Sequence, residues 1–189
     1  MDRKQEILLA ATRSFSLFGY KATTMEQIAK IANVGKGTIY TFFENKEVLF
    51  QEIVLRMIAE MKQEAVNVIK EDASFQENAH AAVMKMLEFR ETHQLFAKII
   101  DEEKEWKTPA VKQVIGQVEQ AIVSFVKEKI DKYMDKGEIR QVNSELVAYL
   151  LLKAYIAFVN DWNATHKQSL SEQEIANFFQ DTIFRSLIN

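Results

Sequence analysis

Apolar side chains recur at three- and four-residue spacing along most of the chain. Between residues 2 and 18 this spacing joins four apolar side chains, and Gly19 follows them as a stop signal: Ile7, Ala11, Phe15 and Phe18. A longer stripe of the same period runs through residues 45–70. The pattern therefore predicts a helix at the N-terminus and a second, longer helix after residue 45.

Two short helices are predicted between these two. Thr23 or Thr24 can open the first of them as the N-cap of a capping box. Asn33 and Gly35 then predict a tight turn, because both residues tolerate left-handed backbone angles. The next helix is predicted over residues 36–43. Three helices with a sharp bend before the third are the layout of a helix-turn-helix module.

The rest of the chain is also predicted to be helical. The segment that starts at Asn143 is apolar around nearly its whole circumference, so we expect it to be buried on both sides. The predicted helices are 74–91, 93–103 (starting at His93), 108–135, 143–165 and 171–188, the last opened by a capping box of Ser171 and Glu174.

Composition supports an all-α chain without disulfides. Hydrophobic residues make up 48% of it, with five glycines, one proline and no cysteine. The apolar patch 146–159 is interrupted by Lys153 and is too short to span a bilayer. The charged N-terminus does not resemble a signal peptide. We therefore expect a cytoplasmic protein with no membrane partner.

Charge is distributed unevenly along the chain. Residues 1–46 carry seven basic and four acidic side chains, whereas residues 47–189 carry 17 basic and 23 acidic ones. An electropositive segment attached to an acidic body is typical of a protein that binds nucleic acid through one part. The basic segment coincides with the predicted helix-turn-helix.

Periodicity assigns a role to each position of the predicted helix 36–43. Ile39 and Phe43 should point inward and anchor the helix. The outward residues suit a phosphate-lined groove, since they supply a charge, hydroxyl groups and an open backbone. They are Lys36, Gly37, Thr38, Tyr40 and Thr41.

The run GYKATTMEQIAKIANVGKGTIYTFFENKEVL, residues 19–49, strongly resembles the signature of the TetR family of transcriptional regulators, and the match extends over about residues 5–55. It departs from the usual pattern at Asn33, Gly35 and Phe42. The resemblance implies a DNA-binding domain over residues 1–46. It also implies the DNA-facing positions Thr24, Lys36, Gly37, Thr38, Tyr40, Thr41, Phe42 and Lys46.

For residues 47–189 the resemblance implies a larger helical domain for ligand binding and dimerisation. The expected protein is a repressor that binds a palindromic operator in double-stranded DNA as a homodimer, through the helices at 143–165 and 171–188. A small apolar or aromatic effector would release it, with no cofactor. The candidate ligand residues are aromatic: Phe89, Phe96, Trp106, Phe125, Tyr155, Phe158 and Trp162.

Two other readings of the C-terminal part stay open, a protein-interaction bundle and a metal-binding enzyme. Glu77 and His80 have the spacing of a di-iron bundle, but His93 and His166 lack the second glutamate that such a site requires. The glycines around Lys36 fit neither a phosphate loop nor a dinucleotide fingerprint. We therefore expect no enzyme activity.

Overall fold

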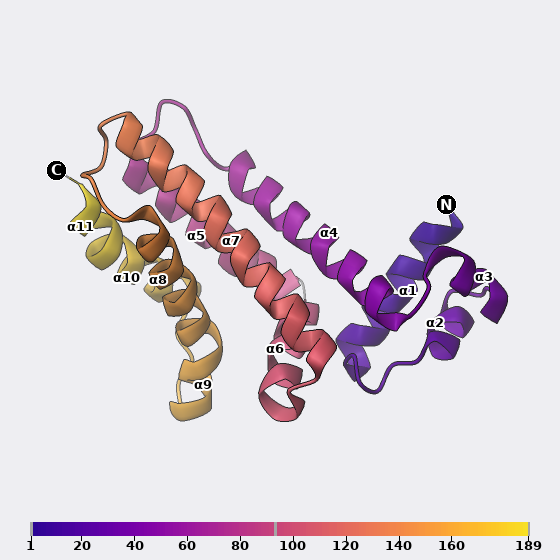
Figure 1. Cartoon of the computed structure of the whole chain (residues 1–189). Helices are drawn as coiled ribbons and strands as arrows, with labels where there is room; N and C mark the ends of the chain where they lie inside the picture. Colours follow the sequence, from indigo (N-terminus) through magenta and orange to yellow (C-terminus); the bar gives the residue numbers. More distant parts are fainter. Residues whose placement is uncertain (1, 93, 189) are drawn as a thin grey trace. The chain divides into compact units, whose positions relative to one another are not determined.

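The computed structural model describes residues 2–92 and 94–188, and every regular element in these ranges is helical (Figure 1). This confirms the all-α prediction. The elements are α1 (Arg3–Phe18), α2 (Met25–Ile31), α3 (Lys36–Phe42), α4 (Lys46–Asn67), α5 (Phe75–Thr92), α6 (Gln94–Trp106), α7 (Pro109–Asp135), α8 (Ser144–Ile156), η1 (Ala157–Asp161), α9 (Trp162–Thr165), α10 (Glu172–Phe178), η2 (Phe179–Phe184) and α11 (Arg185–Leu187), where η denotes a π-helix.

The helices begin where local capping chemistry places them. Thr24 forms the capping box of α2 with Gln27, and Ser171 forms that of α10. The Asn45 side chain accepts a hydrogen bond from the N–H of Val48 at the start of α4. The predicted start of a helix at His93 lies outside the described residues.

The last two predicted helices are each interrupted by a π-helical turn. The predicted helix 143–165 consists of α8, η1 and α9, and the predicted helix 171–188 consists of α10, η2 and α11. A π-helical turn is wider than an α-helical one and changes which side chains share a face. The periodicity of the sequence does not reveal these interruptions.

The chain forms two compact units. Unit 1 comprises Met1–Ala59 and Thr92–Val118, and unit 2 comprises Glu60–Glu91 and Glu119–Asn189. The long helices α4 and α7 each belong partly to one unit and partly to the other. In its packing, α6 belongs to the same unit as α1–α3. The predicted boundary after residue 46 separates a DNA-binding segment from the rest of the chain, so it stays a prediction about function.

Unit 1 is built around an aromatic cluster. The ring of Phe15 on α1 lies 5.2 Å from that of Phe50 on α4, and both contact the ring of Tyr20. Ile39 and Phe43 are fully buried. The inward positions predicted for the third helix are therefore confirmed, and they hold α3 against the rest of unit 1.

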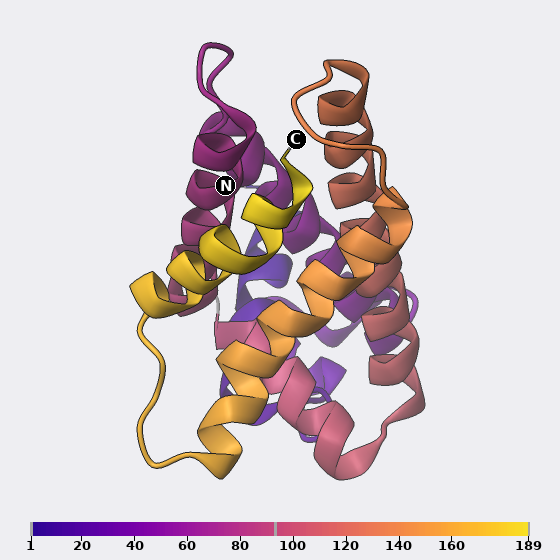
Figure 2. The same cartoon turned by 90° about the vertical axis from the view of Figure 1, so that its left-hand side faces the viewer.

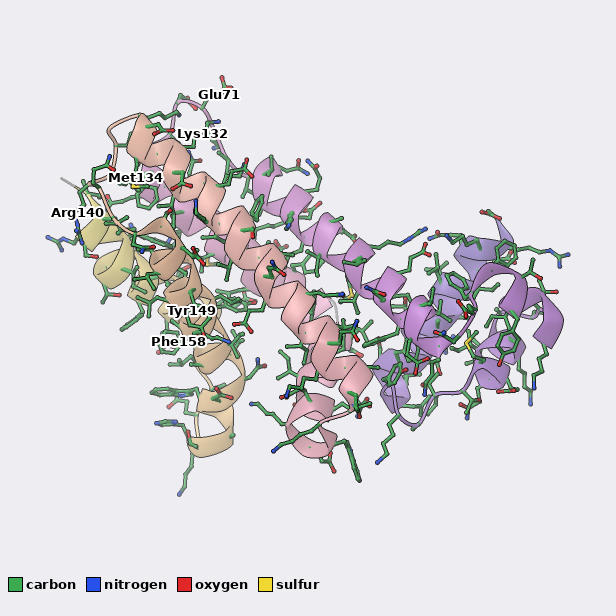
Figure 3. The ribbon with its side chains drawn as sticks, in the orientation of Figure 1. Glu71, Lys132, Met134, Arg140, Tyr149 and Phe158 are labelled. Carbon is green, nitrogen blue, oxygen red and sulfur yellow. The ribbon has the colours of Figure 1, made fainter. Side chains whose placement is uncertain are left out.

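In unit 2 the segments that contain α8 and α10 lie side by side on one face (Figure 2). Their inner sides pack into a core with α5 and α7, in which Phe75 contacts Tyr133 and Phe184. Arg140, which Figure 3 labels, lies in the α7–α8 connection and donates hydrogen bonds to the carbonyls of Ser186 and Leu187.

Replacing Phe43 with alanine should destabilise unit 1, because the ring is fully buried and its removal leaves a cavity. We expect Phe43→Ala to lower the free energy of unfolding by about 3–5 kcal/mol, measured by urea denaturation followed by circular dichroism. Phe42→Ala is the matched control, since the Phe42 ring is 38% exposed. Equal losses in the two variants would contradict this account of how α3 is anchored.

Candidate functional site

The connection between α2 and α3 sets the direction of α3. Asn33 adopts a left-handed conformation with φ of 52°, as its residue type predicts. The N–H of Val34 then donates to the carbonyl of Ala29 at 2.9 Å, which closes the end of α2. This turn, together with the buried side chains of Ile39 and Phe43, presents one face of α3 outward within unit 1.

That outer face combines a charge, hydroxyl groups and bare backbone. Tyr40 is 42% exposed, and Lys36, Gly37 and Thr41 are also exposed, whereas Thr38 is half-buried. A Cβ atom built onto Gly37 would meet no atom within 4 Å. Packing inside the protein therefore does not require glycine at position 37.

Lys36 is oriented by a neighbour on α2. Its ammonium lies 2.6 Å from the carboxylate of Glu26, and both side chains are exposed. The hydrogen bond raises the pKa of Lys36 and lowers that of Glu26. Exposed ion pairs contribute little to stability and exchange readily, so Lys36 stays available to an external phosphate.

Lys46, the remaining basic residue of the predicted DNA-facing set, points into the protein. Its Nζ donates to the backbone carbonyls of Tyr20 and Thr23 at 2.8 and 2.9 Å and lies over the Tyr20 ring. Burial lowers the pKa of this amine, and the carboxylates of Glu47 and Glu102 oppose that shift. Two of its three N–H groups thus hold the connector between α1 and α2.

The same connector is also held by Glu102 of α6, which is 6% exposed. The Glu102 carboxylate accepts hydrogen bonds from the N–H groups of Tyr20, at 2.5 Å, and Lys21, at 2.8 Å. Gly19 has a φ of +83°, and a Cβ there would lie 2.7 Å from Glu102 Oε2. Glycine is therefore required at position 19 for the carboxylate to approach.

Sequence reasoning missed Glu102, although a signal was present. The buried face of α6 carries Leu95, Ile99 and Glu102 at helical spacing. A charged residue on an apolar stripe is costly to bury unless it is hydrogen-bonded, so its position alone could have marked it as paired. We call the Tyr20–Thr23 connector with Glu102 and Lys46 the connector clamp.

Unit 2 contains a cavity of about 210 Å³ whose walls come from α4, α5, α7, α8 and the C-terminal segment. Of the seven aromatic residues proposed as ligand contacts, Phe125 and Tyr155 line it. Aliphatic and methionine side chains make up much of the remainder. These aliphatic and methionine residues of the cavity wall include Met61, Ile69, Val83, Met86, Ile122 and Leu151.

The other five aromatic candidates lie elsewhere. Phe158 packs edge-to-face on Phe178, and Trp162 stacks on His166 with ring centroids 3.6 Å apart. Phe89 is buried in unit 2 but is not part of the cavity wall. The last two, Phe96 and Trp106, belong to α6 in unit 1. Helical spacing placed these side chains on faces but could not tell which face borders the cavity.

Of the Glu77 and His80 pair, Glu77 has a structural role at the start of α5. The Glu77 carboxylate accepts from the N–H and hydroxyl of Ser74 and caps α5. Within the described ranges, no group of three or more potential ligands could hold a metal ion. In the same ranges no helix is both long enough and apolar enough to cross a membrane.

The chain is similar to known DNA-binding regulators. Residues 7–53 match the family described as bacterial regulatory proteins, tetR family. The uncharacterized HTH-type transcriptional regulator YhgD of Bacillus subtilis (strain 168) is 48% identical over 187 residues, which cover 99% of this chain and 97% of that protein. The probable acrEF/envCD operon repressor of Escherichia coli (strain K12) is 38% identical over 79 residues, 41% of this chain and 36% of that protein.

Solved structures share the fold at lower sequence identity. The transcriptional regulator FadR from Bacillus subtilis, in complex with stearoyl-CoA, has a TM-score of 0.79 and 20% identity, over 97% of this chain and 98% of that chain. The likeness to YhgD extends along the sequence of the whole chain, whereas the likeness to FadR is one of fold.

The connector clamp yields a test of its own. In Glu102→Gln one carboxylate oxygen becomes an amide NH₂, which cannot accept from a backbone N–H, so one buried donor loses its partner. We expect the free energy of unfolding to fall by about 1–3 kcal/mol, measured by urea denaturation. Glu105→Gln, an exposed position on the same helix, should change it little. Equal stability of the two variants would show that the clamp does not hold the connector.

Proposed function

Because the chain belongs to the TetR family of transcriptional regulators and has its DNA-binding helix-turn-helix, we propose that it is a ligand-responsive repressor that binds a palindromic operator as a homodimer. The observation that best supports this proposal is the outer face of α3. Exposed polar side chains surround Gly37 there, and packing inside the protein does not require a glycine at that position. The repressor role also draws on the E. coli relative named as an operon repressor. Because it acts on DNA, we place the protein in the cytoplasm.

The proposed operator contacts divide by chemistry. Lys36 supplies a charge for a phosphate, Tyr40 supplies a hydroxyl, and the Phe42 ring can contact a thymine methyl group. Gly37 lets the DNA backbone approach α3 closely. The proposed set remains Thr24, Lys36, Gly37, Thr38, Tyr40, Thr41, Phe42 and Lys46.

Lys46 has a different role in this proposal from the other seven residues. Within the connector clamp its ammonium donates two hydrogen bonds, to the carbonyls of Tyr20 and Thr23. One N–H group is left to donate to a phosphate. We propose that it joins the operator backbone to the α1–α2 connector, so that the clamp and the DNA contact depend on each other.

The proposed dimer interface is the outer side of unit 2. Leu146, Tyr149 and Leu150 lie on one face of α8 and are exposed, as are Phe178 and Ile188 in the C-terminal segment (Figure 3 labels Tyr149). A cluster of large apolar side chains on a surface marks an interaction site. A twofold dimer would place two copies of α3 about 34 Å apart, one turn of DNA.

The proposed effector site is the cavity of unit 2. Its apolar wall suits a ligand with a large apolar part, and the fold neighbour FadR is described in complex with stearoyl-CoA. Helix α4 contributes Met61 and Ala65 to the wall and, at its other end, carries Phe50 in the core of unit 1. A ligand that prefers one position of α4 would shift the population away from operator binding.

The proposal makes a specific prediction for Gly37→Ala, tested on duplexes selected from a random pool by the wild-type protein. Alanine is a better helix former than glycine and would meet no neighbour, so stability should rise by about 0.5–1 kcal/mol. The added methyl group should block the approach of DNA and weaken binding at least about tenfold, measured by fluorescence anisotropy at fixed salt.

These results separate a DNA contact from a folding defect. If Gly37→Ala binds the selected duplex as tightly as the wild type, α3 does not approach DNA at this position. If the wild-type selection yields no palindromic sequence, the proposed mode of operator binding is wrong.

The dimer proposal is tested by Leu150→Glu. Leu150 is 53% exposed on α8, so glutamate should be tolerated in the folded subunit but should oppose burial of this face. We expect a monomer by sedimentation equilibrium and at least about tenfold weaker operator binding. Leu55→Glu, at a position 47% exposed in unit 1, is the control and should remain dimeric. A dimeric Leu150→Glu protein would move the interface elsewhere.

A further inference from the structure

The polar side chains in the wall of the unit 2 cavity are largely engaged within the chain. The amide of Asn78 donates to two backbone carbonyls and to the Tyr133 hydroxyl, and its oxygen accepts from the N–H of Lys70. The Tyr155 hydroxyl donates to the carbonyl of Met86 at 3.1 Å. These groups hold the wall together and are poorly placed to recognise a ligand.

Two lysines in the same wall are in a different situation. Lys62 on α4 and Lys129 on α7 both line the cavity and are half-buried. Their Nζ atoms lie 5.7 and 5.2 Å from the centroid of the Phe125 ring. In the described part of the chain neither forms an ion pair, whereas Lys127 is bonded to Asp131 and Lys153 to Glu119.

This arrangement places two positive charges on one aromatic ring at the wall of an apolar cavity. The ring face attracts a cation and compensates part of the cost of half-burying each ammonium. It does not remove the repulsion between the two like charges. A bound anion near Phe125 would offset that repulsion and supply acceptors that the described residues do not offer to either ammonium group.

We propose that the effector is an anionic amphiphile, whose carboxylate or phosphate head is bound by Lys62 and Lys129 and whose apolar part fills the cavity. The cavity, at about 210 Å³, is larger than the roughly 150 Å³ cavity that accommodates benzene. The cavity therefore has room for an apolar part larger than a single ring. This inference rests on the proposed role of the cavity as the effector site. It adds the charge of the effector and the two residues that bind its head.

The charge of the head is tested by calorimetric titration of the whole 189-residue chain with four ten-carbon compounds below their micelle-forming concentrations. These are decanoate, decyl phosphate, 1-decanol and decyltrimethylammonium. We expect the tighter of the two anions to bind at least about tenfold more strongly than the alcohol, with the cation weakest. Comparison of decanoate with decyl phosphate identifies the head.

The two lysines are tested by Lys62→Met and Lys129→Met, which keep much of the side-chain length while removing the charge. Each should weaken binding of the preferred anion about tenfold and leave that of 1-decanol nearly unchanged. Lys132→Met, at an exposed position of α7 that does not line the cavity, is the matched control and should bind all four compounds as the wild type does.

Several results would overturn the inference, and they differ from those that would overturn the proposed function. Equal binding of 1-decanol and the anions, or an unchanged anion preference in both lysine variants, would show that the head is not recognised by charge. If 1-decanol also releases the selected duplex, the cavity remains the effector site without an anionic head. If no ten-carbon compound binds, an anionic amphiphile is excluded as the effector. Operator binding is tested separately, by the selection of duplexes from a random pool.

Discussion

The connector between α1 and α2 has backbone N–H groups and backbone carbonyls that are both held by side chains from other parts of the sequence. Glu102 accepts from the N–H groups of Tyr20 and Lys21, and Lys46 donates to the carbonyls of Tyr20 and Thr23. Leaving such groups buried without partners would cost on the order of 1–3 kcal/mol each. The position of α2, and through it that of α3, depends on this clamp.

The clamp also explains why two features of unit 1 cannot vary independently. Gly19 is needed because a Cβ at that position would collide with the Glu102 carboxylate. The Tyr20 ring is needed because it packs on Phe15 and Phe50 and lies under the Lys46 ammonium. By contrast, glycine at position 37 meets no neighbour inside the protein. Gly19 is therefore required by the fold, whereas Gly37 is available for contact with a partner.

The features that could be predicted from the sequence are those with local causes. Thr24, Asn33 and Ser171 act within a few residues of themselves, so capping and turn rules located them. Glu102 and Tyr20 are 82 residues apart, and no local rule connects them. Five of the seven aromatic residues predicted to contact a ligand lie outside the cavity wall for a related reason, since periodicity shows that the residues of a helix share a face but not what that face borders. The inward turn of Lys46 likewise depends on carbonyls contributed by another helix connection.

The chain also limits how a ligand in unit 2 can influence α3. Helix α4 lines the cavity with Met61 and packs Phe50 into the core of unit 1, while α5, another wall of the cavity, leads along the chain to α6, which carries Glu102. Two covalent routes therefore run from the cavity wall to the DNA-binding module, one to its core and one to its clamp.

A ligand shifts a conformational equilibrium only as far as its affinities for the two states differ, and a nearly complete switch requires a difference of about 10⁴-fold. A charge-assisted hydrogen bond needs a narrow range of distance and angle, so a head bound by both Lys62 on α4 and Lys129 on α7 would lose a contact when the two helices move apart. The proposed recognition of charge at Phe125 would thus make effector binding depend on the position of α4.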